Sequence, residues 1–348
     1  MPVDQYEAKG ILTDLWPLID SDSEISRDDL MTHFFDSLSV DGKLYQIVSS
    51  FNLSTVAGKT SVVGSGSSWT IDQLMEILDQ QPEGTSIFSD YDTKSSILQN
   101  CVARNIESFI DWSSMTCSFD SQEFIDLLTF ANQFPLKIAD DSTDEEYEYD
   151  AARLRSGKQM LYSTDLYGFN SYLYAANVFG EETNFIGYPT TGTNGNCFTF
   201  YESMGISSKC ANVDAAWRFL RTFLTEDYQS TNSTYQFPTN KHVFESVAKE
   251  YMTPEYETDA ETGEQVESAK TYIWYDDNTQ VPIYAMTQEE YDAFMALYNS
   301  TTNVSSYNEE IYNLITDQTD AFFNGQKTAE ETAKLIQSSV SLYVFENA

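Results

Sequence analysis

The sequence predicts an α/β protein, because strand and helix patterns alternate through residues 154–228. A short strand is expected at Phe185–Pro189, a turn-rich loop of Thr, Gly and Asn follows it, and a second strand is expected at Met204–Ser207. A helix is expected to begin near Asn212. The length of 348 residues allows one large domain or two lobes, and a sizeable core in either case.

Aromatic residues are abundant and lie among small polar ones. They make up 14% of the chain, with 23 Tyr, 22 Phe and 5 Trp, so some rings are expected at a surface or in a cleft. The stretches Thr190–Gly195 and Thr199–Ser203 mix small, polar and aromatic side chains, which suits a groove with hydrogen-bond partners and flat apolar faces. This composition favours a sugar-like or peptide-like ligand. The alternative is a Tyr-rich core with hydrated hydroxyls.

The chain is strongly acidic. It has 18 Lys and Arg against 55 Asp and Glu, which gives a formal net charge of −37. Such a surface repels phosphate backbones and anionic lipid headgroups. The charge therefore argues against nucleic acid as a partner, and no apolar run approaches the roughly 20 residues that a membrane-spanning helix needs.

The N-terminal part is predicted to be helical, with one strand. A short helix stops at Gly10, and Ser26 with Asp29 resembles a capping box for a helix over Arg27–Leu38. A strand is expected at Lys43–Phe51 after a turn, and residues 59–68, rich in Gly, Ser and Thr, are expected to form a surface loop.

Capping pairs mark the starts of later helices. The pairs are Thr70 with Gln73, Thr287 with Glu290, Ser306 with Glu309, and Thr328 with Glu331. Residues 271–286 alternate bulky side chains around a polar turn and predict a hairpin. Trp274 and Tyr275 point to opposite faces of such a strand, so one of them is available to a ligand.

No cofactor or metal site is expected. The four cysteines, Cys101, Cys117, Cys197 and Cys210, fit neither a metal spacing nor a dense disulfide framework, and their pairing stays open. The acidic run at residues 140–150 lacks the spaced pattern and the glycine of a calcium loop, so a solvated acidic face is expected.

No catalytic motif places a nucleophile or a base. The motifs G-x-S-x-G, G-x-G-x-x-G, H-E-x-x-H and the P-loop do not occur, and His33 and His242 lie in ordinary helical contexts. A binding protein without catalytic activity is therefore the first hypothesis. A glycosidase-like carbohydrate-active enzyme and a surface adhesion module are the alternatives, since carboxylates are plentiful enough for an acid and nucleophile pair.

Several ordered segments resemble the extracellular solute-binding proteins of sugar-type ABC transporters, of a bacterial, Firmicutes-like kind. The matching segments are Gly157-Lys158-Gln159-Met160, Pro189–Asn196, Gly205-Ile206-Ser207, the helix Asp214–Leu220, the phrase FIDWSSMTCSFDSQEF around Trp112, and the final stretch from Ala321. They cover most of the chain in the family's order. The resemblance is specific to the family and does not identify a particular sugar.

The resemblance implies a two-lobed, type II periplasmic-binding-protein-like α/β fold with the first lobe incomplete, because the family has further N-terminal sequence before Met1. Residues 1–48 would end the N-terminal lobe, 49–203 would form the C-terminal lobe, 204–240 would return to the first lobe, and 241–348 would complete the second. The chain would cross between lobes at Lys43–Phe51, where Val48 replaces the family's usual proline.

The resemblance also implies a function and a site. The chain would capture a carbohydrate between the lobes and deliver it to permease subunits, as a monomer in a cell-surface lipoprotein outside the cell. It would meet the membrane only through a lipid anchor that this chain does not contain. The expected ligand-binding residues come from separate segments and are Phe51, Asp165, Tyr167, Tyr201, Glu202, Trp274 and Tyr307.

Overall fold

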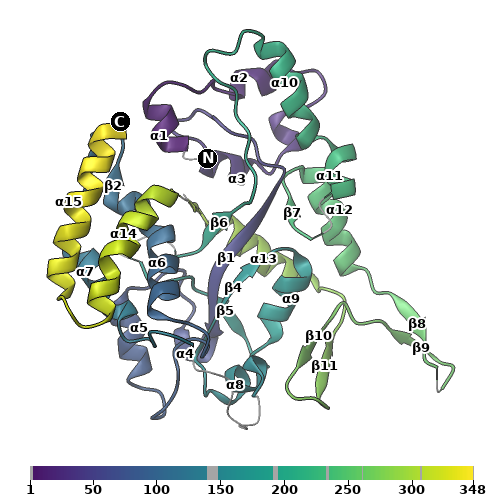
Figure 1. The fold of residues 1–348 in the computed structure, drawn as a ribbon. Coiled ribbons are helices and arrows are strands. Elements are labelled where there is room, and N and C mark those ends of the chain that lie inside the picture. The colour runs from purple at the N-terminus through teal and green to yellow at the C-terminus, as the bar shows by residue number, and fades with distance from the viewer. Residues whose placement is uncertain are drawn as a thin grey trace.

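The computed structural model describes residues 3–138, 148–190, 195–232, 235–260, 262–305 and 308–347 (Figure 1). One long strand, β1 (Ser50–Lys59), runs through the centre. It pairs antiparallel with β4 (Leu161–Leu166), β5 (Thr183–Phe185), β6 (Cys197–Thr199) and β7 (Phe237–Pro238), and β12 (Asn303–Val304) adds to β6 in parallel. The six-stranded sheet is therefore built around β1, whose inner eight residues are all buried.

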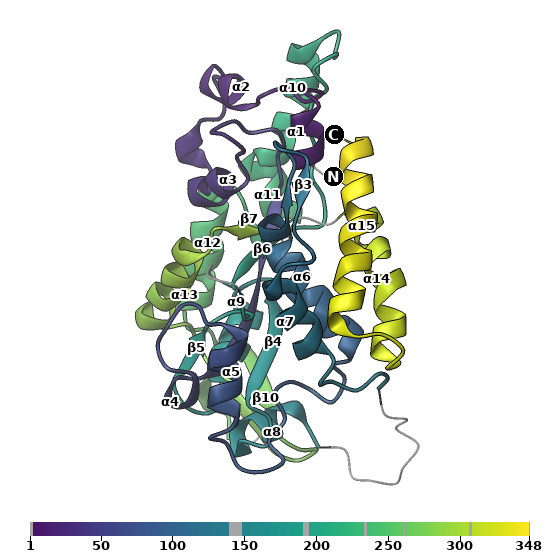
Figure 2. The same cartoon turned by 90° about the vertical axis from the view of Figure 1, so that its left-hand side faces the viewer.

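Helices surround this sheet on several sides (Figures 1 and 2). At the top of Figure 1 lie α1 (Val3–Ala8), α2 (Trp16–Asp20), α3 (Thr32–Ser37), α10 (Val213–Arg221) and α11 (Glu226–Asn232). On the left lie α6 (Lys94–Phe109), α7 (Gln122–Ala131), α14 (Glu309–Phe323) and α15 (Ala329–Asn347). The remaining helices are α4 (Thr60–Val63), α5 (Ile71–Leu78), α8 (Asp150–Ser156), α9 (Phe169–Asn177), α12 (Lys241–Met252) and α13 (Gln288–Ser300).

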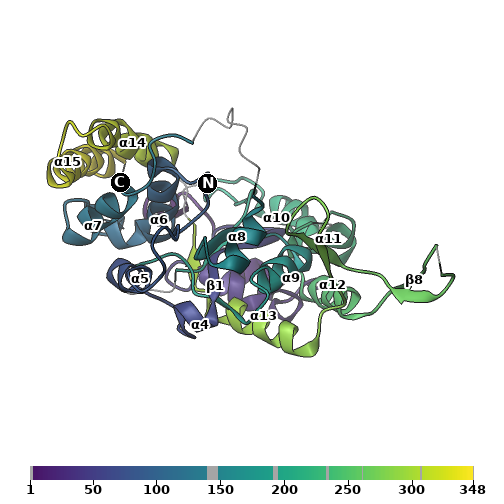
Figure 3. The same ribbon diagram turned by 90° about the horizontal axis from the view of Figure 1, so that it is seen from below.

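Among the described residues, three two-stranded hairpins lie outside the central sheet. They are β2 (Ile110–Asp111) with β3 (Thr116–Cys117), β8 (Tyr256–Thr258) with β9 (Gln265–Glu267), and β10 (Thr271–Trp274) with β11 (Gln280–Ile283). The β8–β9 hairpin projects away from the body, as the view from below shows (Figure 3). The β10–β11 hairpin packs on α9 instead.

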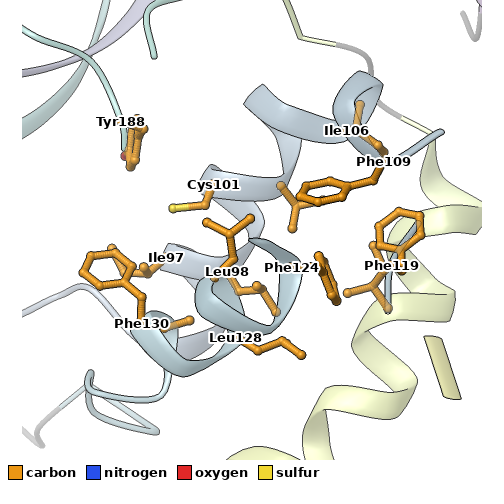
Figure 4. Packing of buried hydrophobic residues seen from close by; sticks show 14 of the residues in the cluster. Ile97, Leu98, Cys101, Ile106, Phe109, Phe119, Phe124, Leu128, Phe130 and Tyr188 are labelled. Carbon is orange, nitrogen blue, oxygen red and sulfur yellow. The ribbon is translucent and has the colours of Figure 1, made fainter. Parts of the chain in front are cut away.

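The larger core cluster packs α6, α7, α14 and α15 against one side of the sheet (Figure 4). Phe109, Phe119 and Phe124 meet edge to face or tilted at its centre, with the Phe119 and Phe124 ring centroids 5.0 Å apart. Cys101 lies in the same cluster, and Trp112 packs at its edge against Tyr343. No two of the four cysteines are joined in a disulfide.

A second cluster, which we call the aromatic cluster, contains a group of packed aromatic rings centred on Phe51 of β1. The Phe51 ring stacks on Phe34 at 4.9 Å and on Phe237 at 5.5 Å between centroids. Phe237 in turn lies 4.8 Å from Phe294 of α13. This cluster joins segments that are distant in sequence, from the N-terminal helices to the helix α13.

Several predicted helix starts are confirmed, because capping depends on local chemistry. Asn212 caps α10 through the amide N–H of Ala215 at 3.0 Å. Thr70 and Thr287 each form a reciprocal capping box at the expected residue. Ser306 lies outside the described residues, and α14 begins at Glu309 with Asn308 as its N-cap.

The predictions for the strands and for the helix at 27–38 need correction. The strand expected at Lys43–Phe51 begins only at Ser50, and the expected loop at 59–68 contains the short helix α4. The helix breaks at Leu30, because Leu30 bridges to Asn240. Long-range backbone pairing therefore replaces the helical hydrogen bonds here.

Met204–Ser207 forms isolated bridges and no full strand. Met204 pairs with Ile47, and Ser207 pairs with Leu12. The bridge between Met204 and Ile47 brings together the segment Lys43–Phe51, predicted to cross between lobes, and the segment Met204–Ser207, where the chain was predicted to return to the first lobe. The lobe boundaries themselves stay a prediction.

Replacing Phe51 by alanine is expected to lower the free energy of unfolding by about 3–5 kcal/mol, because the cavity would lie at the centre of the aromatic cluster. Urea denaturation measures this change. Phe219 of α10 is exposed, so Phe219→Ala is the control and is expected to change stability by less than about 0.5 kcal/mol. Equal, small effects of the two substitutions would contradict the packing described.

Candidate functional site

A pocket of ≈ 670 Å³ opens where the end of β4, the start of α9 and the segment before β7 meet. Most of its lining is aromatic. The lining residues are Tyr167, Gly168, Phe169, Asn170, Ser171, Tyr201, Tyr235, Gln236, Phe237, Val247 and Tyr251. Its volume falls within the range of about 300–1,000 Å³ that is usual for small-molecule sites.

The alternation of β1 separates polar from apolar side chains beside this pocket. Ser50, Asn52 and Ser54 share one face of the strand, whereas Phe51 and Leu53 lie on the other face in the aromatic cluster. Gln236 connects the pocket to the polar face. Its Oε1 accepts a hydrogen bond from Ser50 Oγ at 2.7 Å, and its Nε2 donates to Asn52 Oδ1 at 3.2 Å.

Tyr167 is positioned by the turn from β4 into α9. Leu166 pairs with Leu53 of β1, so Tyr167 follows the last paired residue. The amide N–H groups of Tyr167 and Gly168 both donate to Ser171 Oγ, at 2.8 and 3.2 Å. Ser171 Oγ therefore satisfies two backbone donors at the start of α9 and orders the turn that carries the ring.

The electrostatics of the pocket favour a neutral ligand. None of the described residues that line it carries a formal charge, although the whole chain has a net charge of −37. Burial, and then the nearby Asp165 and Tyr201, raise the pKa of Tyr167. Its hydroxyl therefore remains protonated at neutral pH and is able both to donate and to accept a hydrogen bond.

The structure brings two of the sequence-predicted site residues, Tyr167 and Tyr201, to this pocket. Asp165 precedes Tyr167 by two residues and pairs with Ser54, and Glu202 is exposed beside Tyr201. Neither carboxylate lines the pocket among the described residues.

The other three predicted residues lie elsewhere. Phe51 is fully buried in the aromatic cluster, so its expected role as a ligand contact is corrected to that of a core residue. Trp274 is exposed on the β10–β11 hairpin and is not among the pocket residues. Tyr307 lies outside the described residues.

Sequence reasoning missed Phe169, Tyr235, Gln236 and Tyr251. Tyr235 and Gln236 immediately precede Phe237-Pro238, and no motif in the sequence marks them as ligand contacts. Tyr251 lies in the last turn of α12 and reaches the pocket only through tertiary packing, with its ring 5.8 Å from that of Phe169. No local pattern separates such a residue from an ordinary core tyrosine.

The histidines are engaged in structural contacts. His33 Nε2 lies 2.7 Å from the carbonyl oxygen of Thr301, and His242 Nε2 lies 3.3 Å from Asp29 Oδ1. In the described part of the chain, no group of three His, Cys, Asp or Glu side chains is arranged to hold a metal ion. The acidic run was expected to be a solvated face, and its residues 140–147 lie outside the described residues.

None of the described helices has both the length and the apolar character needed to cross a lipid bilayer.

Comparison with known proteins identifies the fold. Neither a family model nor a curated protein sequence matches the chain. Solved structures do match over nearly all of it. A sugar-binding protein from Xanthomonas citri shares 11% identity at a TM-score of 0.56, covering 99% of this chain and 82% of that one.

Two further structures give the same result. An ABC substrate-binding protein from Listeria monocytogenes, in complex with cycloalternan, shares 14% identity at a TM-score of 0.52, covering 98% of this chain and 82% of that one. An ABC transporter solute-binding protein from Thermotoga lettingae, bound to α-D-tagatose, shares 11% identity at a TM-score of 0.51, covering 98% of this chain and 82% of that one. This chain is similar to them in fold, so the predicted two-lobed α/β architecture is confirmed.

Tetranitromethane is expected to nitrate the exposed Tyr201 and Tyr235 before the buried Tyr172. Tyr201 and Tyr235 are 76% and 84% exposed, whereas burial, with a contribution from Glu290, raises the pKa of Tyr172 and suppresses the reactive phenolate. Peptide mass spectrometry at increasing reagent concentration gives the order. Early nitration of Tyr172 in the folded protein would contradict the burial described.

Proposed function

We propose that this chain is the carbohydrate-binding component of an ABC importer, which captures a sugar or oligosaccharide and delivers it to permease subunits. The observation that carries the proposal is an uncharged, aromatic pocket with carboxamide and hydroxyl groups on its walls, within a two-lobed α/β fold. The proposal includes an extracellular location, attachment of the parent protein as a lipoprotein, and a monomeric state.

The chemistry of the pocket suits a sugar. Tyrosine rings pack against the apolar C–H faces of a pyranose, while tyrosine hydroxyls and carboxamides exchange hydrogen bonds with its hydroxyl groups. Asn170 and Gln236 supply carboxamides, and the lining tyrosines supply hydroxyls. The Ser171 hydroxyl is already used by the backbone of Tyr167 and Gly168. A charged ligand would find no counter-charge among these lining residues, which disfavours phosphorylated or acidic sugars.

The ligands named for the similar structures support the same class. They are cycloalternan for the Listeria protein and α-D-tagatose for the Thermotoga protein. At identities of 11% and 14% these names do not carry over to a particular sugar. They do agree with the neutral, polyhydroxylated ligand that the pocket residues favour.

Binding in this account needs no covalent step. Closure of the two lobes around the sugar would exclude water and strengthen the polar contacts. The lobe boundaries at residues 48, 203 and 240 belong to this proposal.

A screen of neutral mono- and oligosaccharides by thermal shift, with product analysis of the same mixtures, separates binding from turnover. Stabilisation without a hydrolysis product supports the binding function. Formation of a product would indicate a carbohydrate-active enzyme instead.

Tyr167→Ala and Tyr201→Ala are each expected to weaken sugar binding by about 1–3 kcal/mol, roughly 5- to 150-fold in Kd, because each removes a ring from the pocket. Tyr167→Phe keeps the ring and is expected to lose less affinity for the sugar than Tyr167→Ala. Isothermal titration calorimetry measures the affinity of each variant.

The matched control is Tyr256→Ala, since Tyr256 is an exposed tyrosine on the β8–β9 hairpin, outside the pocket. It is expected to bind as the parent does. If the parent binds a sugar and the folded pocket variants bind it equally well, the ligand occupies another site.

A further inference from the structure

The hairpin β10–β11 presents an aromatic face to solvent. Tyr272 and Trp274 of β10 are 42% and 44% exposed, while Ile273 between them is fully buried. Tyr272 pairs with Pro282, and Trp274 pairs with Gln280. Tyr284, which follows β11 in the same alternation, is 46% exposed. We call Tyr272, Trp274, Gln280, Pro282 and Tyr284 the outer hairpin face.

The opposite face anchors the hairpin to the protein. Ile273 packs in a small cluster with Val178 and Phe179, just beyond α9. The Tyr275 hydroxyl donates to the carbonyl oxygen of Val178 at 3.4 Å, and the Arg155 guanidinium lies 4.8 Å from the Tyr275 ring. The outer hairpin face is therefore held on a supported strand pair, and its aromatic rings are not among the residues of the cluster beneath.

The hairpin starts at the edge of the pocket. Asn170, which lines the pocket, donates from Nδ2 to the carbonyl oxygen of Lys270 at 3.1 Å. The Lys270 ammonium lies 5.9 Å from the centroid of Tyr251, another lining residue. At a rise of about 3.3 Å per residue, Trp274 lies roughly 13 Å along the strand from Lys270. The outer hairpin face thus begins beside the pocket.

The chemistry of the outer hairpin face matches that of the pocket. Its five residues are uncharged, in a chain whose net charge is −37. An uncharged surface of flat rings with one carboxamide complements a neutral ligand that has apolar faces and polar edges, such as a chain of pyranose units. Contact with a protein partner is the alternative interpretation of the exposed rings on this face. The face begins beside the pocket at Lys270, whose charge is paired with Glu255 at 2.6 Å, and this closeness to the pocket favours the glycan.

We propose that the outer hairpin face is a second carbohydrate-binding surface that extends the pocket, so that the protein binds glycans longer than the pocket itself holds. This inference rests on the proposed function. It adds a specific consequence: affinity should increase with glycan length, and that increase should depend on Tyr272 and Trp274.

The test compares the parent with the double variant Tyr272→Ala/Trp274→Ala. The probes are the malto-, cello-, xylo- and chito-oligosaccharide series, from disaccharide to heptasaccharide, measured by calorimetry. The parent is expected to bind longer members more tightly. The double variant is expected to bind the shortest member normally and to lose about tenfold or more for the longest. Trp274→Phe is expected to keep most of the length effect, and Tyr256→Ala is the control on the neighbouring hairpin.

The outcomes separate the two proposals. Equal affinity of the parent and the double variant for every length would overturn the extended surface while leaving the pocket intact, provided that Tyr167→Ala still weakens binding. Equal loss for short and long glycans would also overturn it, because the hairpin would then act only by supporting the pocket. Self-association of the parent that the double variant lacks would assign the face to protein contact. Failure of the parent to bind any of the glycans would reject both proposals.

Discussion

The central strand β1 imposes the constraint on which the other parts of the structure depend. Its pleat sends Phe51 and Leu53 into the aromatic cluster and Ser50 and Asn52 to the opposite face, where Gln236 bonds to both. A shift of one residue in its pairing would bury the polar set among phenylalanines and place the apolar set against Gln236. The same register thus stabilises the core and fixes the position of the pocket wall. β1 has few alternative pairings, because it hydrogen-bonds to four strands.

The helix α9 connects the central sheet to both candidate ligand surfaces, the pocket and the outer hairpin face. Its first turn carries Phe169, Asn170 and Ser171, which all line the pocket. Ser171 holds the turn of Tyr167, whereas Asn170 holds the start of the β10–β11 hairpin. The first turn of α9 therefore contacts the pocket and also holds the start of the hairpin that carries the outer hairpin face. The absence of charge from both surfaces is consistent with one neutral ligand class.

Local chemistry and long-range packing explain which features could be predicted from the sequence. The caps at Thr70, Asn212 and Thr287 were predictable, because a cap depends on residues within one turn. The strand β1 was displaced in the prediction, because its start is set by pairing with Phe237-Pro238, which is distant in sequence. The two-lobed fold and the choice of Tyr167 and Tyr201 came from the family resemblance. Tyr235, Gln236 and Tyr251 were not predictable, because tertiary packing alone brings them to the pocket.

The central claim is that a neutral sugar binds among Tyr167, Tyr201 and Gln236, beside the polar face of β1. A crystal structure of the protein with an oligosaccharide that stabilises it tests this claim most directly. The account predicts a pyranose ring packed against at least one of the two tyrosines, with its hydroxyls within hydrogen-bond distance of the Asn170 or Gln236 carboxamide. A sugar bound elsewhere, with this pocket empty, would contradict it.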